Sequence, residues 1–142
     1  MLYNILLNAH SGLRWVVLLL IIVTIINAAQ GMNSRRMVSL RDKRLSLVSL
    51  SFVHLQVVIG LVLYFISPRV QFSASTMSNK MLRFYTVEHL VGMLIAVILV
   101  TIGHRKSKSG SLKEVFWYYV IALIVMLVTI PWPFRGLGSG WF

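Results

Sequence analysis

The chain has 142 residues, of which 58% are hydrophobic and only 12% are charged, with a formal net charge of +11. An ordinary soluble domain carries about 25% charged residues, so this composition predicts an integral membrane protein of one domain, 1–142, without a separate aqueous domain. The sequence contains no cysteine, which excludes disulfides, thiolate-ligated clusters and c-type haem, so histidine must hold any metal or cofactor.

Four apolar runs are long enough to cross a bilayer, whose hydrocarbon core of about 30 Å needs about 20 apolar residues in a helix. They predict spanning helices over about 13–30, 45–66, 84–103 and 115–130. The first run lacks the basic segment and cleavage site of a secretory signal, so we expect it to stay as a helix that begins near Asn8 or Ser11. The short connections predict an all-α, antiparallel four-helix bundle.

Lysine and arginine gather in two of the connections. The segments 31–44 and 104–114 hold nine of them, whereas the segment 67–83 and the C-terminal tail hold four. The positive-inside rule therefore puts the first and third connections in the cytoplasm, in contact with anionic lipid, and both termini outside. Nucleic-acid binding is not indicated, because the basic residues do not form one face with interleaved aromatic residues.

Each predicted helix carries small and polar residues at helical spacing, and such faces are expected to meet inside a membrane bundle. These residues are His10, Arg14, Val17, Ile21, Thr24 and Asn27; Ser46, Ser49, Val53, Gln56, Gly60 and Tyr64; Tyr85, Glu88, His89, Gly92, Ala96 and Gly103; and Tyr119, Ala122, Met126 and Thr129. The glycines and alanine of the third helix either allow a neighbouring helix to approach or leave a groove for a flat cofactor. Plain packing is the favoured interpretation.

Ionisable side chains within the membrane are costly and often functional. His54, Glu88 and His89 lie at membrane depth, and His10 lies at the outer edge of the first helix. His10 with His89, or His54 with His89, are candidate axial pairs for a haem b held between helices. The ordinary alternative is a histidine that is hydrogen-bonded to a neighbouring hydroxyl or carbonyl. His104, at the inner edge, is expected to join the cytoplasmic basic cluster.

Other residues would complete such a site. Gly92 would leave room for the porphyrin. Its propionates would be bound on the outer side by Arg14, Arg83, Arg135 and Tyr85. Glu88 is interpreted either as a proton carrier or quinone ligand, or as an ion pair with Arg14 or Arg83.

Gln56 is either a quinone contact or an interhelical hydrogen bond, which is the default. The tail 131–142 is rich in proline, glycine and aromatic residues, and we expect it to anchor in the outer interface, to cap the pocket or to dock on a partner.

Four segments carry a resemblance to a known group of proteins. HSGLRW at 10–15, HLQVVIGLVLY at 54–64, RFYTVEHLVGMLIAVILVTIG at 83–103 and IPWPFR at 130–135 together resemble small four-helix bacterial membrane proteins described as cytochrome b-like. The resemblance covers nearly the whole chain. It implies that His10, His54 and His89 are metal ligands and that the protein is multi-pass in the bacterial cytoplasmic (inner) membrane.

Two functions of different classes stay open. The first is a haem b or quinone-linked electron-transfer subunit. The second is a cofactor-free accessory or scaffold subunit that docks on other membrane subunits or on a second copy as a homo-oligomer. Independent enzymatic activity is not expected, because the sequence has no phosphate loop and no serine-histidine-acid set. Proton conduction through Glu88 would need a polar path that the inner halves of the helices do not offer.

Overall fold

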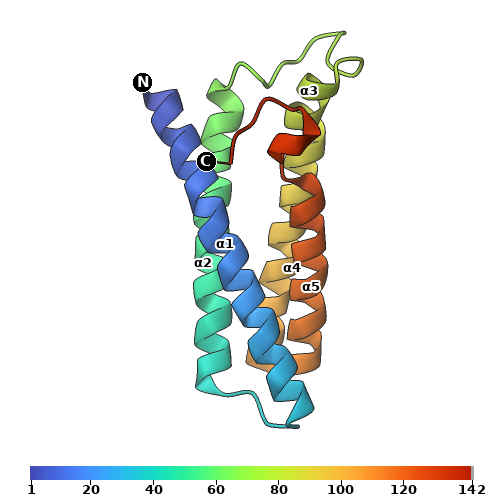
Figure 1. The fold of residues 1–142 in the computed structure, drawn as a ribbon. Coiled ribbons are helices and arrows are strands. Elements are labelled where there is room, and N and C mark those ends of the chain that lie inside the picture. Colours follow the sequence, from blue (N-terminus) through green and yellow to red (C-terminus); the bar gives the residue numbers. More distant parts are fainter. Residues whose placement is uncertain (142) are drawn as a thin grey trace.

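The computed structural model describes residues 1–141, which form an antiparallel bundle of long helices (Figure 1). The long helices are α1 (Leu2–Asn33), α2 (Leu40–Ile66), α4 (His89–Ser109) and α5 (Leu112–Thr129). The short helix α3 (Lys80–Arg83) and a π-helical turn, η1 (Phe84–Glu88), lead without interruption into α4, and a 3-10 turn, η2 (Pro133–Arg135), follows α5. Together they give 4 helices long and apolar enough to cross a membrane, which confirms the predicted bundle.

Helix α1 begins earlier than the sequence predicts, at Leu2 instead of near Asn8 or Ser11. The first residues contain no proline or glycine that would stop a helix, so the helical geometry continues to the N-terminal end of the chain. At 1.5 Å per residue, its 32 residues extend over about 48 Å, well beyond a hydrocarbon core of about 30 Å. One end of α1 therefore projects past the apolar layer.

The packing order around the bundle places α1 diagonally opposite α4. Helix α1 packs against α2 and α5, and α4 packs against the same two helices. Both chain ends and the long connection 67–79 lie at one end of the bundle, called here the outer end (Figure 1). The connection 34–39 and the turn at Gly110 lie at the opposite, inner end. Side chains from α1 and α4 can thus meet only across the middle of the bundle.

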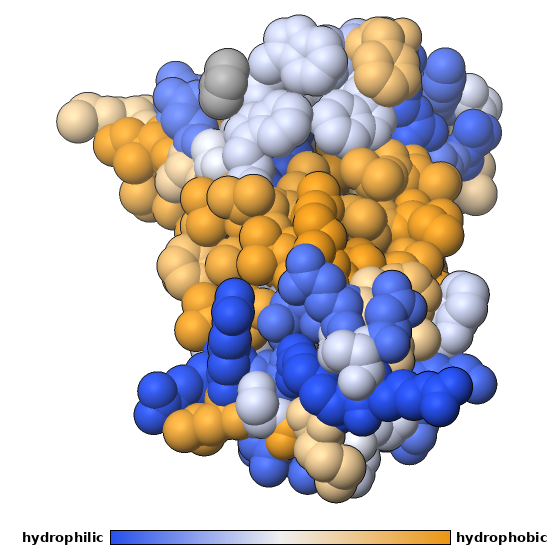
Figure 2. Space-filling view, turned by 60° about the horizontal axis from the view of Figure 1, so that its bottom comes forward, coloured by the Kyte–Doolittle hydropathy of each residue, from blue (hydrophilic) through white to orange (hydrophobic). Residues whose placement is uncertain are grey.

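The buried face of each helix is the one that small and polar residues predict, except at Glu88, which is exposed, and the core follows these faces. A fully buried apolar layer that includes Ile21, Ala96, Val100 and Ala122 fills the middle of the bundle. Large apolar side chains cover the outside of the helices instead, and Figure 2 shows them as a hydrophobic band between two hydrophilic ends. A band of this kind is suited to contact with lipid acyl chains.

A buried acid fastens the first connection at the inner end. The Asp42 side chain accepts hydrogen bonds from Arg36 at 2.6 Å, from the amide of Asn27 and from the Ser39 backbone N–H at 2.7 Å. It also completes a capping box with Ser39, the N-cap of α2. The hydrogen bond from Arg36 to the Asp42 carboxylate raises the pKa of Arg36 above its usual value. Asp42 therefore ties α1, the connection and α2 together.

His104 does not join the basic surface cluster that the sequence suggests. It is 5% exposed, and its Nδ1 is 2.9 Å from the Ser46 hydroxyl, which is itself 2.9 Å from the Ser107 hydroxyl. The Tyr119 hydroxyl donates to the Ser46 carbonyl at 3.1 Å. Small partners on α2 and α4 thus let His104 turn into the bundle, where it serves packing between helices.

Candidate functional site

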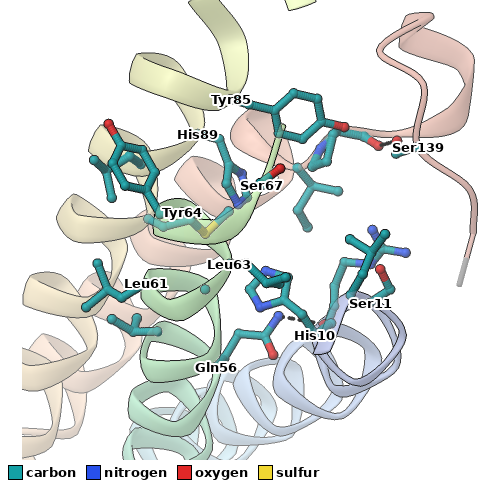
Figure 3. Close-up of a pocket in the computed structure, with 18 of the residues that line it drawn as sticks. His10, Ser11, Gln56, Leu61, Leu63, Tyr64, Ser67, Tyr85, His89 and Ser139 are labelled. Atoms are coloured by element: carbon teal, nitrogen blue, oxygen red, sulfur yellow. Dashed lines mark hydrogen bonds between the residues drawn. The ribbon is translucent and has the colours of Figure 1, made fainter. Parts of the chain in front are cut away.

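A cavity of about 160 Å³ lies in the outer half of the bundle, between α1, α2, α4 and α5 (Figure 3). Its walls are mainly apolar and include Leu18, Val57, Leu90, Met93 and Met126. The polar side chains that reach it come from different elements and include His10, Gln56 and His89. A mainly apolar pocket with a few converging polar groups is typical of a small-molecule or cofactor site.

Two histidines face each other across this cavity. His10 of α1 and His89 of α4 have ring centroids 6.3 Å apart and ring planes inclined by 78°. Figure 3 shows that they approach from opposite sides. Because α1 and α4 are diagonal in the bundle, this pair spans its centre. The structure thus assembles one of the two histidine pairs that the sequence suggests.

His89 is held in one orientation by a backbone group. Its Nδ1–H donates to the Thr129 carbonyl at 2.7 Å, near the C-terminal end of α5. Nε2 is then the ring nitrogen that carries the lone pair. Histidines that bind metals are commonly oriented in this way, with the second nitrogen donating to a carbonyl.

The cavity also collects buried polar atoms without partners. Among residues 1–141, three side-chain atoms are buried and have no hydrogen bond, namely His10 Nδ1, Arg14 Nε and Gln56 Oε1. All three residues line this cavity. A buried polar atom without a partner is unfavourable and rare in folded proteins. All three atoms could be satisfied by a ligand or by ordered water in this cavity.

The π-helical turn η1 sets the position of His89, and the sequence gives no signal of it. The His89 backbone N–H donates to the Phe84 carbonyl, five residues earlier, which widens the helix by one residue per turn. Phe84 is 2% exposed and packs with its ring 6.0 Å from the His89 ring. Such turns are frequent at functional sites.

Gly92 allows α4 and α5 to approach closely behind His89. A methyl group at this position would lie 2.2 Å from Thr129 Cγ2, so the two helices could not keep their present separation. Gly92 does not line the cavity, which agrees with the packing interpretation. Its effect on the site is indirect, because the same helix contact places the Thr129 carbonyl beside His89.

We expect Gly92→Ala to destabilise the protein by about 1–3 kcal/mol, the usual cost of overpacking a core. The measurement is thermal unfolding in detergent followed by circular dichroism. Gly12→Ala is the control, because nothing lies within 4 Å of a methyl group there. Equal melting temperatures for the two variants would contradict the proposed helix contact.

Two arginines and the C-terminal segment form the rim of the cavity. Arg14 donates to the Trp141 carbonyl at 2.6 Å, and Arg69 donates to the Gly138 carbonyl at 2.6 Å and to the Tyr85 hydroxyl at 3.2 Å. Tyr85 in turn donates to the Leu137 carbonyl at 3.1 Å. The sequence predicts roles for Arg14 and Tyr85 but gives no specific signal for Arg69. The tail lies over the open end of the pocket.

Of the remaining predicted site residues, only Gln56 lines the cavity. His54 is exposed on α2 and is not brought to His89. Glu88 forms an exposed ion pair with Arg83 at 2.8 Å, the plainer of its two interpretations. Arg135 donates to the carbonyls of Val128 and Ile130 after α5. Gln56 makes an interhelical hydrogen bond to the His10 carbonyl at 2.8 Å, but it also lines the cavity.

No protein-family profile, curated protein sequence or solved structure matches this chain.

Proposed function

We propose that this protein is a membrane-embedded b-type cytochrome that binds one haem between α1 and α4, with His10 and His89 as the axial ligands. The observation that carries the proposal is the facing pair of imidazoles, whose centroids are 6.3 Å apart. Two imidazoles on opposite sides of one metal ion have centroids about 6 Å apart, because each metal–nitrogen bond is about 2 Å and the ring centre lies about 1 Å further back.

The donor set favours haem over a bare metal ion. Within residues 1–141, no group of three or more histidine, cysteine, aspartate or glutamate side chains is arranged to hold a metal ion. Haem iron needs only two protein ligands, because the porphyrin supplies the other four. The apolar walls of the cavity suit the flat faces of the macrocycle, and His10 Nδ1 offers a nitrogen without a partner. When bound, haem would supply one-electron transfer.

The position of the cavity suggests where electrons would enter and leave. The site lies in the outer half of the bundle, and the inner end carries most of the loop arginines and lysines. By the positive-inside rule the inner end faces the cytoplasm. We propose that the protein lies in a bacterial cytoplasmic membrane, as the resemblance implies, and exchanges electrons near the external face with another membrane subunit or with a quinone.

The first test is the visible spectrum of the protein purified in mild detergent from cells supplied with haem. A Soret band, split alpha and beta bands on reduction and a one-to-one stoichiometry in the pyridine haemochrome assay are expected. A colourless protein that stays without a Soret band after titration with haemin would contradict the proposal. It would favour the accessory role, in which the outer tail docks on a larger complex.

Gly60 provides a second test, because it leaves the space in which the His10 ring lies. A Cβ atom at Gly60 would be 3.0 Å from His10 Cε1. We expect Gly60→Val to displace the ring and to weaken haem binding by about 10-fold, the lower end of effects from groups that orient a ligand. Gly12→Val is the control, because a side chain at position 12 would meet open space. It measures the effect of placing valine in the same helical bundle without a contact to His10. Haem titrations that give equal affinities for the two variants would contradict the assigned position of His10.

Gln56 favours a second candidate ligand, a quinol headgroup. The Gln56 Oε1 atom is buried without a donor, and a quinol hydroxyl would supply one. Extraction of the purified protein with organic solvent, followed by chromatography, would detect a bound quinone at near-stoichiometric amounts. Gln56→Leu should remove this quinone if the candidate is correct, and it should leave a haem spectrum in place if haem is the ligand.

A further inference from the structure

Arg14 is a buried cation that has no acidic partner among residues 1–141. Arg14 is 8% exposed and lines the outer cavity. The chain contains three acidic residues, and all of them are paired elsewhere. The pairs are Asp42 with Arg36, Glu88 with Arg83, and Glu114 with Lys106. Buried charges are normally paired, so among the residues that the structure describes nothing neutralises this guanidinium.

Arg69 is a second cation on the same rim, and it has no acidic partner among residues 1–141 either. Both guanidinium groups donate to backbone carbonyls of one short segment, Arg14 to Trp141 and Arg69 to Gly138, each at 2.6 Å. The buried Nε of Arg14 makes no hydrogen bond at all. Guanidinium groups are suited to bidentate binding of carboxylates, and neutral carbonyls use only part of this capacity.

We infer that Arg14 and Arg69 form a binding site for two carboxylates of one amphiphilic ligand, and that the carbonyls of 138–141 occupy this site until the ligand replaces them. The inference rests on the proposed function, since haem b carries two propionates at one edge of an otherwise apolar ring. A haem held by His10 and His89 would have both arginines within reach of that edge, because all four residues line the same cavity. The Tyr85 hydroxyl accepts a hydrogen bond from Arg69 at 3.2 Å and so orients this guanidinium group.

The C-terminal segment is built so that its last residues can turn away while its anchor stays. Leu137 is 1% exposed and fixes the segment to the bundle. The glycines on both sides of it adopt left-handed conformations, with φ of 65° at Gly136 and 71° at Gly138. Glycine adopts such conformations without steric cost. Rotation at Gly138 would free both arginines, and charge-assisted hydrogen bonds to carboxylates are stronger than those to neutral carbonyls.

The test compares haemin with haemin dimethyl ester, which keeps the ring and the iron but lacks both carboxylates. Each is titrated into haem-free protein in detergent. For Arg69→Gln, we expect the affinity for haemin to fall by about 10-fold or more, as for loss of a hydrogen bond to a charged group. Its affinity for the dimethyl ester should equal that of the unchanged protein. Lys80→Gln, which removes another outer charge, should leave both affinities unchanged.

The outcomes separate the two proposals. If Arg69→Gln binds haemin as tightly as the unchanged protein does, the carboxylate site is wrong while the histidine site stands. If the unchanged protein binds neither compound, both proposals fail. Arg14→Lys is the conservative second variant, because it keeps the buried charge and removes the forked donor. It should also weaken haemin binding but not ester binding, and equal losses for both ligands would count against the carboxylate site.

Movement of the segment can be followed with a single cysteine, because the chain has none. Ser139→Cys places a thiol on the segment, and Ser78→Cys places one on the exposed outer connection as a control. Haemin should accelerate maleimide labelling at position 139 several-fold and leave position 78 unchanged. Slower or unchanged labelling at 139 on haemin binding would overturn the proposed exchange of carbonyls for carboxylates.

Discussion

Replacing His89 with alanine should abolish bis-histidine haem binding and leave the bundle folded. The side chain supplies one of the two facing imidazoles, and its loss removes one of the two proposed ligands. Changes to groups that only orient a ligand typically cost 10–100-fold in metal affinity, so loss of the ligand itself should exceed about 100-fold. Haemin titration followed at the Soret band measures this change, with circular dichroism to verify helix content.

The matched control is His54→Ala, because His54 is a histidine of the same bundle that lies exposed on α2. This variant should retain the spectrum of the unchanged protein. His10→Met adds a positive test, since a histidine-methionine pair keeps six-coordinate iron but raises the reduction potential. An unaltered spectrum in His89→Ala, or loss of haem in His54→Ala alone, would show that the wrong histidine pair has been assigned.

The largest effect on stability is expected for Asp42→Ala at the inner end. Asp42 is 4% exposed, and its removal deletes the capping box of α2 and a buried hydrogen bond from Asn27. Loss of a helix cap costs about 1 kcal/mol, and loss of a buried hydrogen bond to a charged group costs about 2 kcal/mol. We therefore expect the free energy of unfolding to fall by about 3 kcal/mol, as measured by reversible unfolding in mixed detergent.

Glu114→Ala is the control for this prediction. Glu114 also stands three residues after a serine N-cap, Ser111, and also forms an ion pair, but its side chain is 44% exposed. Water and salt screen such a pair, and exposed ion pairs contribute little. An equal decrease in the free energy of unfolding for the two variants would contradict the idea that Asp42 stabilises the protein because it is buried.

Much of the fold could be predicted from the sequence because bilayer thickness fixes the length of an apolar helix. The inward faces could also be predicted, since small and polar residues such as Ser46, Ser49 and Ala96 have a reason to avoid lipid. The same logic places His10, Arg14 and His89 at one end. It fails for His104, whose position next to a basic loop suggests a surface group although its partners lie inside.

The finer parts of the site depend on contacts that no local pattern encodes. The choice between His10 and His54 as the partner of His89 depends on how α2 is rotated about its axis. The Thr129 carbonyl reaches His89 only because Gly92 lets α5 approach. Arg69 enters the rim through the course of a long connection. Each of these contacts depends on how two elements are placed relative to each other. The periodicity of residues within one helix carries no information about that placement.

The fully buried apolar layer around Ile21, Ala96, Val100 and Ala122 separates the outer cavity from the polar groups of the inner end. A charge that moves through a membrane gains or loses about 2.3 kcal/mol per 100 mV of transmembrane potential, in proportion to the part of the field it crosses. An electron that enters and leaves the proposed site from the outer side would cross only a small part of it. Such a protein would conduct electrons along the membrane surface, and its turnover would neither be driven by the membrane potential nor contribute to it.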